Sequence, residues 1–177
     1  MEKIQRMGAG KMEENHKRDT LHEIIKATEI AMLTSVSPGG ELRSRPMATQ
    51  ESDFDGTLWF FAKSSSEKTE DLQEESHVNV SYSQPNKNRY ASLSGTAVLV
   101  RDKAKMKELW KPLYKAWFPE GLEDPSLALI QVRVEKAEYW DGPSSKIVAL
   151  AEMLRSAVTG KPFSAGENSR VNLPPHS

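Results

Sequence analysis

The sequence predicts one domain of the mainly β (α+β) class, in which about six strands form an antiparallel barrel or sandwich with peripheral helices. Three observations lead to this prediction. Six segments have the composition or the alternation of strands. Short turn signals, rather than long crossover helices, join most of them. The length of 177 residues is that of one ordinary domain.

The beginning of the chain is polar, and residues 1–18 predict a flexible lead-in. Thr20 and Glu23 then form a capping-box pattern, and an apolar stripe at helical spacing follows. We therefore expect a short helix over about residues 19–29, which opens a folded domain of residues 19–158.

Two hairpins are expected next. Ile30–Val36 is apolar and β-prone, and Ser37–Gly40 is a strong turn signal before Glu41–Gln50. The pair Asp55-Gly56 is a second turn signal, which joins the preceding segment to the aromatic strand Thr57–Ala62.

The middle of the chain predicts a helix and two further strands. Ser66 or a neighbour caps a short polar helix that ends at about residue 75. Val78–Tyr82 alternates in the manner of a half-buried strand, and Tyr90–Val100 is a long strand in which Gly95 marks a bulge.

Helical spacing returns over residues 102–116, where Trp110 lies on the apolar face. Trp110 and Trp117 are expected in the core or in a subunit contact.

The last predicted strand is Ala128–Trp140, and a final helix covers residues 146–158. Residues 159–177 are rich in Gly, Pro, Ser and Asn, and this composition predicts a disordered tail.

The bulk composition excludes several functions. The chain has 24 Lys and Arg, 25 Asp and Glu and no cysteine. A formal net charge of -1 argues against binding to nucleic acid or to an anionic membrane. Without cysteine there is no disulfide, thiolate metal site or iron–sulfur cluster. No window is apolar enough for a membrane helix, so the expected location is the cytoplasm.

Common catalytic motifs are also missing. The sequence has no G-x-G-x-x-G and no H-E-x-x-H, and its four histidines are scattered. His77, at the start of a predicted strand, fits a structural role better than a metal ligand. A bound cofactor is therefore the expected source of any difficult chemistry.

One constellation suits a phosphate. The aromatic strand ends in Ser64-Ser65-Ser66, which opens a helix, and Lys68 lies in the first turn of that helix. A lysine there opposes the helix dipole unless an anion is bound. Arg45, on a neighbouring strand, could hold the same phosphate with its planar guanidinium. The alternative is that the serines only cap a surface helix and that both cations are solvated.

These stretches resemble the FMN-binding split barrel of the pyridoxamine 5'-phosphate oxidase-like superfamily, and more narrowly its general stress protein branch. The resemblance runs from about Asp19 to Trp140. It is carried by Arg45-Pro46-Met47-Ala48-Thr49, by Phe60 to Lys68, by Arg89 to Ala97 with Gly95, and by Glu138-Tyr139-Trp140-Asp141.

The resemblance implies a six-stranded split barrel and a homodimer with FMN at the subunit interface. Arg45, Ser66 and Lys68 would hold the phosphate, and Trp140 of the partner subunit would lie near the flavin. Tyr90 stands where the oxidase has a glutamine that contacts the ring. The backbone of two strands would bracket the ring, at Pro46, Met47, Ala48, Thr49, Phe61 and Ala62.

Departures from the oxidase pattern argue against oxidation of vitamin B6. Ala62 replaces a threonine, Glu67 stands where a second basic residue often lies, and the C-terminal arginine-rich segment has no counterpart. The leading hypothesis is a stress-linked, FMN-dependent oxidoreductase that acts on an unidentified small molecule. Two alternatives stay open: a non-catalytic flavin-binding or sensing protein, and a pocket for deazaflavin or haem, for which His77 is the only plausible axial ligand.

Overall fold

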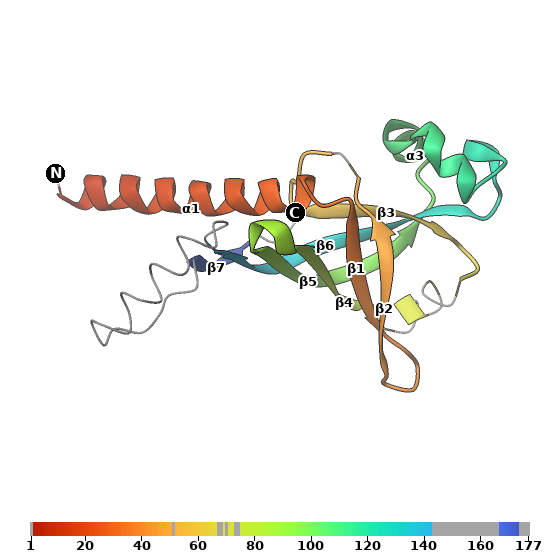
Figure 1. Ribbon diagram of the computed structural model, residues 1–177, viewed down its shortest axis with the longest axis horizontal. Coiled ribbons are helices and arrows are strands. Elements are labelled where there is room, and N and C mark those ends of the chain that lie inside the picture. Colours follow the sequence, from red (N-terminus) through yellow and green to blue (C-terminus); the bar gives the residue numbers. More distant parts are fainter. Residues whose placement is uncertain are drawn as a thin grey trace.

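The computed structural model describes residues 2–50, 52–66, 69, 71–72, 75–142 and 167–173. Its strands are antiparallel and form one sheet of seven, in the order β2-β1-β4-β5-β6-β3 with β7 paired to β6 (Figure 1). The strands are β1 (Ile30–Val36), β2 (Leu42–Ala48), β3 (Thr57–Lys63), β4 (His77–Gln84), β5 (Arg89–Val100), β6 (Leu127–Asp141) and β7 (Glu167–Asn172). The predicted mainly β class is confirmed, with seven strands in place of six.

Helix α1 spans Glu2–Lys26, so it begins well before the short helix predicted over residues 19–29. Ion pairs one turn apart support the polar part of the helix, such as Lys17 to Glu13 at 2.7 Å. Leu21 and Ile24 are fully buried and anchor its C-terminal part on the barrel. The N-terminal half extends beyond the strands (Figure 1).

The first predicted hairpin is confirmed. β1 and β2 pair from Ile30↔Ala48 to Val36↔Leu42. In the turn, Gly40 has a φ of 82°, which glycine adopts without strain. The Ser37 hydroxyl accepts a hydrogen bond from the Glu41 N–H at 3.1 Å.

The second predicted hairpin is wrong, because β3 does not pair with β2. It pairs with β6, from Thr57↔Arg133 to Lys63↔Leu127, at the other end of the sheet order. The buried side chain of Phe60 in β3 lies opposite the buried Ile130 of β6. A turn signal predicts that the chain reverses, whereas matching buried faces select the partner strand.

β5 pairs with β6 from Arg89 to Val100 on one side and with β4 from Arg89 to Thr96 on the other. Its register with β6 shifts between Ser94 and Gly95, as the predicted bulge requires. A Cβ atom on Gly95 would lie 1.9 Å from the carbonyl oxygen of Arg133. Only glycine fits at this bulge between β5 and β6.

The segment between β5 and β6 forms a small helical lobe, shown at the upper right of Figure 1. It contains α3 (Lys103–Leu109), η2 (Pro112–Ala116) and η3 (Gly121–Glu123). The prediction of one helix over residues 102–116 is wrong at Pro112, because proline disfavours helical backbone in the residue before it and cannot donate a hydrogen bond.

β7 lies within residues 159–177, for which the composition predicted a disordered tail. It pairs with β6 from Asp141↔Glu167 to Lys136↔Asn172. Val171 is buried in the barrel core, and Leu173, which follows the strand, packs against the same cluster. The predicted helix over residues 146–158 lies outside the described residues.

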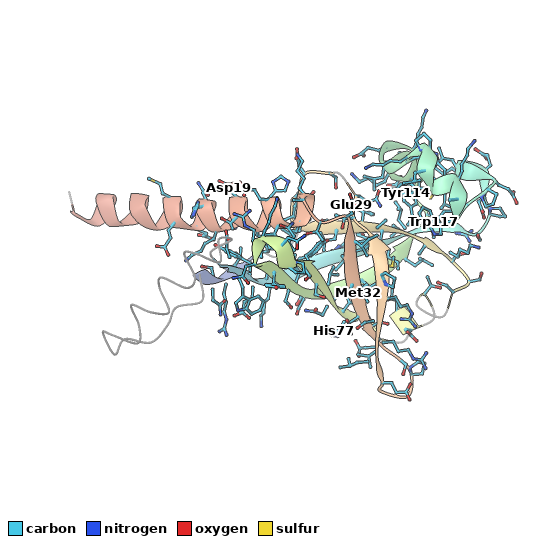
Figure 2. All side chains as sticks on the ribbon, in the orientation of Figure 1. Asp19, Glu29, Met32, His77, Tyr114 and Trp117 are labelled. Atoms are coloured by element: carbon cyan, nitrogen blue, oxygen red, sulfur yellow. The ribbon has the colours of Figure 1, made fainter. Side chains whose placement is uncertain are left out.

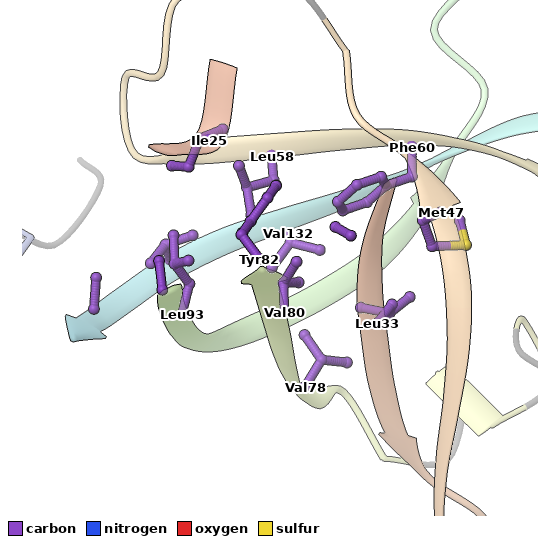
Figure 3. Close-up of a cluster of buried hydrophobic side chains, with 14 of the residues drawn as sticks. Ile25, Leu33, Met47, Leu58, Phe60, Val78, Val80, Tyr82, Leu93 and Val132 are labelled. Carbon is purple, nitrogen blue, oxygen red and sulfur yellow. The ribbon is translucent and has the colours of Figure 1, made fainter. Parts of the chain in front are cut away.

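The described residues have two hydrophobic clusters. The larger fills the barrel and includes Leu33, Phe60, Val80, Leu93 and Val132 (Figure 3). The smaller lies beneath the helical lobe and comprises Met106, Leu109, Tyr114, Phe118, Leu127 and Leu129. Among the helices in the described part of the chain, none is long and apolar enough to cross a membrane.

Candidate functional site

Arg45 on β2 is held by two hydrogen bonds. Its Nη1 donates to the Ser35 hydroxyl and its Nη2 donates to the Asp71 carboxylate, each at 2.9 Å. Asp71 belongs to the segment that follows Ser66 and β3. The structure therefore brings Arg45 against the segment that the sequence predicted as its neighbour, through a carboxylate that the sequence reasoning did not single out.

The serine-rich loop is held by its own hydrogen bonds. The Ser66 hydroxyl donates to the Lys63 carbonyl at 2.9 Å, and the Ser66 N–H donates to the Thr69 hydroxyl at 3.1 Å. Arg101, another residue missed from the sequence, donates to the Ser64 hydroxyl at 2.9 Å. Lys68 lies outside the described residues, as does Glu67, so its predicted phosphate contact stays a prediction.

The residues predicted to bracket a flavin ring lie on two strand ends. Met47 and Ala62 are buried, with 3% and 1% of their surfaces exposed, so at these positions a ligand would meet backbone groups. Pro46 is exposed on the outer face of the sheet, opposite Met32. The Thr49 N–H donates to the Glu29 carbonyl at 2.8 Å, which extends the β1–β2 pairing.

Ala48 and Phe61 come together at the helical lobe, because both pack against its buried cluster. The Phe61 ring centroid lies 5.7 Å from that of Trp110 and 5.1 Å from that of Tyr114. The Tyr114 hydroxyl also donates to Gln50 at 3.0 Å. The lobe is thus fixed to both predicted ring-bracketing strands.

The two tryptophans of the lobe differ. Trp110 packs against the cluster as predicted, whereas Trp117 is 56% exposed and lies outside the core of this chain. Figure 2 shows Tyr114 and Trp117 together in the lobe, away from Met32 and His77 on the sheet.

Tyr90 and Trp140 are direct cross-strand neighbours on β5 and β6. Both are partly exposed, at 37% and 39%. Strands β1, β4 and β5 separate β6 from β2 in this part of the sheet. Trp140 and Arg45 thus lie on strands that do not pair with each other.

His77 is an exposed residue at the start of β4, and its Nδ1 lies 2.6 Å from a Glu75 carboxylate oxygen. The backbone hydrogen bond from His77 lowers the pKa of Glu75. Among the described residues, no group of three or more His, Asp or Glu side chains could hold a metal ion.

The sequence profile of the pyridoxamine 5'-phosphate oxidase-like family matches residues 16–164, which contain strands β1 to β6, the serine-rich loop and the lobe. The chain belongs to this family. The predicted resemblance to the split-barrel superfamily is therefore confirmed.

Individual proteins that are similar in sequence or in structure agree with this family. The chain is 30% identical to protein bli-3 of Neurospora crassa over 168 residues, which cover 89% of this chain and 80% of that protein. A protein assigned as general stress protein 26 from Jannaschia sp. CCS1 has the same fold, with a TM-score of 0.71 and 21% identity, over 87% of this chain and 96% of that one. The general stress FMN/FAD binding protein of Xanthomonas citri has a TM-score of 0.65 and 28% identity, over 72% of this chain and 90% of that one.

Proposed function

We propose that this chain binds flavin mononucleotide, with the phosphate between Arg45 and the serine-rich loop that contains Ser66 and precedes Lys68. The observation that carries the proposal is the 2.9 Å bond from Arg45 to Asp71, which holds the guanidinium beside the segment that follows this loop. The flavin-binding relative from Xanthomonas citri supports the same class of ligand.

The described residues fit a phosphate. A guanidinium carries five N–H donors, and the two bonds from Arg45 use only one on Nη1 and one on Nη2. The Arg45 side chain is 21% exposed, so part of it can be reached from solvent. Charge-assisted bonds from arginine to phosphate are among the stronger polar contacts in proteins.

The second part of the proposal is a homodimer with FMN at the subunit interface. Apolar side chains are exposed on several strands of the sheet, and such a surface favours burial against another copy. They are Ile30, Met32, Leu42, Tyr90, Val98 and Trp140. In this arrangement Trp140 of the partner subunit would lie near the flavin. A monomeric mass by light scattering, with FMN bound, would refute this arrangement.

The third part is an FMN-dependent oxidoreductase reaction on a small molecule, linked to general stress. When bound, FMN would supply the hydride or electron transfer. The residues of this chain would bind and orient the cofactor: Arg45 at the phosphate and the strand ends at Ala48 and Phe61 beside the ring. The aromatic lobe would exclude water from that side of the ring.

Flavin binding is tested by the visible spectrum and by titration with FMN and riboflavin. Arg45→Ala would leave Asp71 buried without its partner, so Arg45→Lys is the better variant, because it keeps the charge and removes the planar fork. Combined with Lys68→Ala, it should weaken FMN by about 1.5–3 kcal/mol for each charged hydrogen bond lost. Arg170→Lys, on β7, is the matched control and should bind as the wild type does.

A colourless protein that does not bind added FMN would refute the proposal. If FMN binds, stopped-flow mixing with NADH or NADPH separates an enzyme from a storage or sensing protein. Rapid bleaching of the flavin, followed by reoxidation with an acceptor, supports the oxidoreductase. A flavin that neither nucleotide reduces favours the non-catalytic alternative.

A further inference from the structure

The carboxylate of Asp71 lies at the centre of a buried polar cluster. Only 3% of its side chain is exposed. Its Oδ2 accepts hydrogen bonds from the Ser35 hydroxyl at 3.0 Å and from Arg45 Nη2 at 2.9 Å. Arg43 Nη1 lies 3.8 Å from the other oxygen, Oδ1. The cluster joins β1, β2 and the segment that follows the serine-rich loop.

Ser35 closes this cluster into a triangle. Its hydroxyl donates to Asp71 and accepts from Arg45 Nη1 at 2.9 Å. The guanidinium of Arg45 is therefore fixed at two of its nitrogens by two groups that are bonded to each other. A planar group held at two points has a fixed plane, and its remaining N–H donors point in fixed directions.

Stability alone is a weak reason for such a cluster. Removing two charges from water is costly, and a well-packed apolar pair often stabilises a fold as well as a buried ion pair does. A role in orienting Arg45 accounts for the arrangement better, because the side chain of an unrestrained arginine samples many rotamers.

We propose that Asp71 is a positioning residue, which together with Ser35 orients the guanidinium of Arg45 toward the phosphate of a flavin. The ligand selected in this way is a phosphorylated flavin rather than riboflavin. This inference rests on the proposed function, since it needs a flavin phosphate at Arg45.

The test compares FMN with riboflavin, because the two ligands differ only in the phosphate. Asp71→Asn keeps the shape of the side chain and removes its charge. We expect it to lower the affinity for FMN about tenfold, because one charge-assisted hydrogen bond is lost. The affinity for riboflavin should change less than about twofold. The ³¹P resonance of bound FMN should also move toward that of free FMN.

Ser35→Ala is the second variant, because it should destabilise the fold less than Asp71→Asn does. It removes one neutral hydroxyl and should lower FMN affinity in the same direction by a smaller factor. Glu23→Gln is the control, because Glu23 also pairs with an arginine, Arg89 at 3.4 Å, but lies on α1. It should leave both affinities unchanged.

The outcomes separate the two proposals. A wild-type protein that binds no FMN overturns the proposed function itself. If the wild type binds FMN, three results for the variants overturn the role of Asp71. These are an equal loss of affinity for both flavins, no loss of affinity for either, and a gain of affinity for FMN. If Asp71→Asn does not fold, the ratio of the FMN and riboflavin affinities in Ser35→Ala decides, and an unchanged ratio refutes the inference.

Discussion

Gly95→Ala should destabilise the protein strongly, because the bulge between β5 and β6 leaves no space for a methyl group. The added Cβ would lie 1.9 Å from the Arg133 carbonyl oxygen and 3.0 Å from the Val134 Cα. Both are backbone atoms, so no side-chain rotation relieves the overlap. We expect a loss of about 3 kcal/mol or more, at the upper end of the usual cost of overpacking.

Thermal unfolding measures this effect, and Gly39→Ala supplies a matched control. For a chain of this size the loss corresponds to a Tm lower by roughly 6–12 °C. A Cβ on Gly39 would meet only the Ser37 hydroxyl oxygen, at 3.8 Å, so that variant should unfold near the wild-type temperature. If the two variants unfold at the same temperature, the close β5–β6 contact is refuted.

Two further predictions concern aromatic residues. Burial raises the pKa of the Tyr82 phenol, so above about pH 10 the unfolded chain ionises this group while the folded chain keeps its proton. The free energy of unfolding should therefore fall as the pH rises above 10. Urea titrations between pH 9 and 11 should show a smaller fall for Tyr82→Phe than for the wild type, and an identical fall in both proteins contradicts this prediction. In the lobe, Phe118→Ala should lower the free energy of unfolding by about 3–5 kcal/mol, because Phe118 is buried. Trp117 is exposed, so Trp117→Ala should lower it by under about 1 kcal/mol, and equal losses would refute the packing described.

The two proposals share one structural feature, the contact between β2 and the segment after β3. In this contact a buried carboxylate, Asp71, faces the only residue of β2 that the sequence predicted as a phosphate ligand. The arrangement gives Arg45 two roles, as the partner of Asp71 and as a donor to a ligand. The comparison of FMN with riboflavin measures the role of Arg45 as a donor to the ligand, separately from its role as the partner of Asp71.

Local patterns in the sequence were sufficient for most of the strands. The β1–β2 hairpin follows from the turn at Ser37–Gly40, which acts over a few residues. The bulge at Gly95 follows from a glycine inside a β-prone run. Arg45 and the serine-rich loop could be proposed as neighbours because their residue types suit one ligand.

The tertiary structure alone decided which segments meet. β3 pairs with β6 rather than with β2, since partner choice depends on how whole faces match. β7 forms because Val171 reaches the core, which a polar tail composition does not reveal. Asp71 reads in the sequence as one of many acidic helix residues, and only the packing of its segment on β1 and β2 makes it the partner of Arg45.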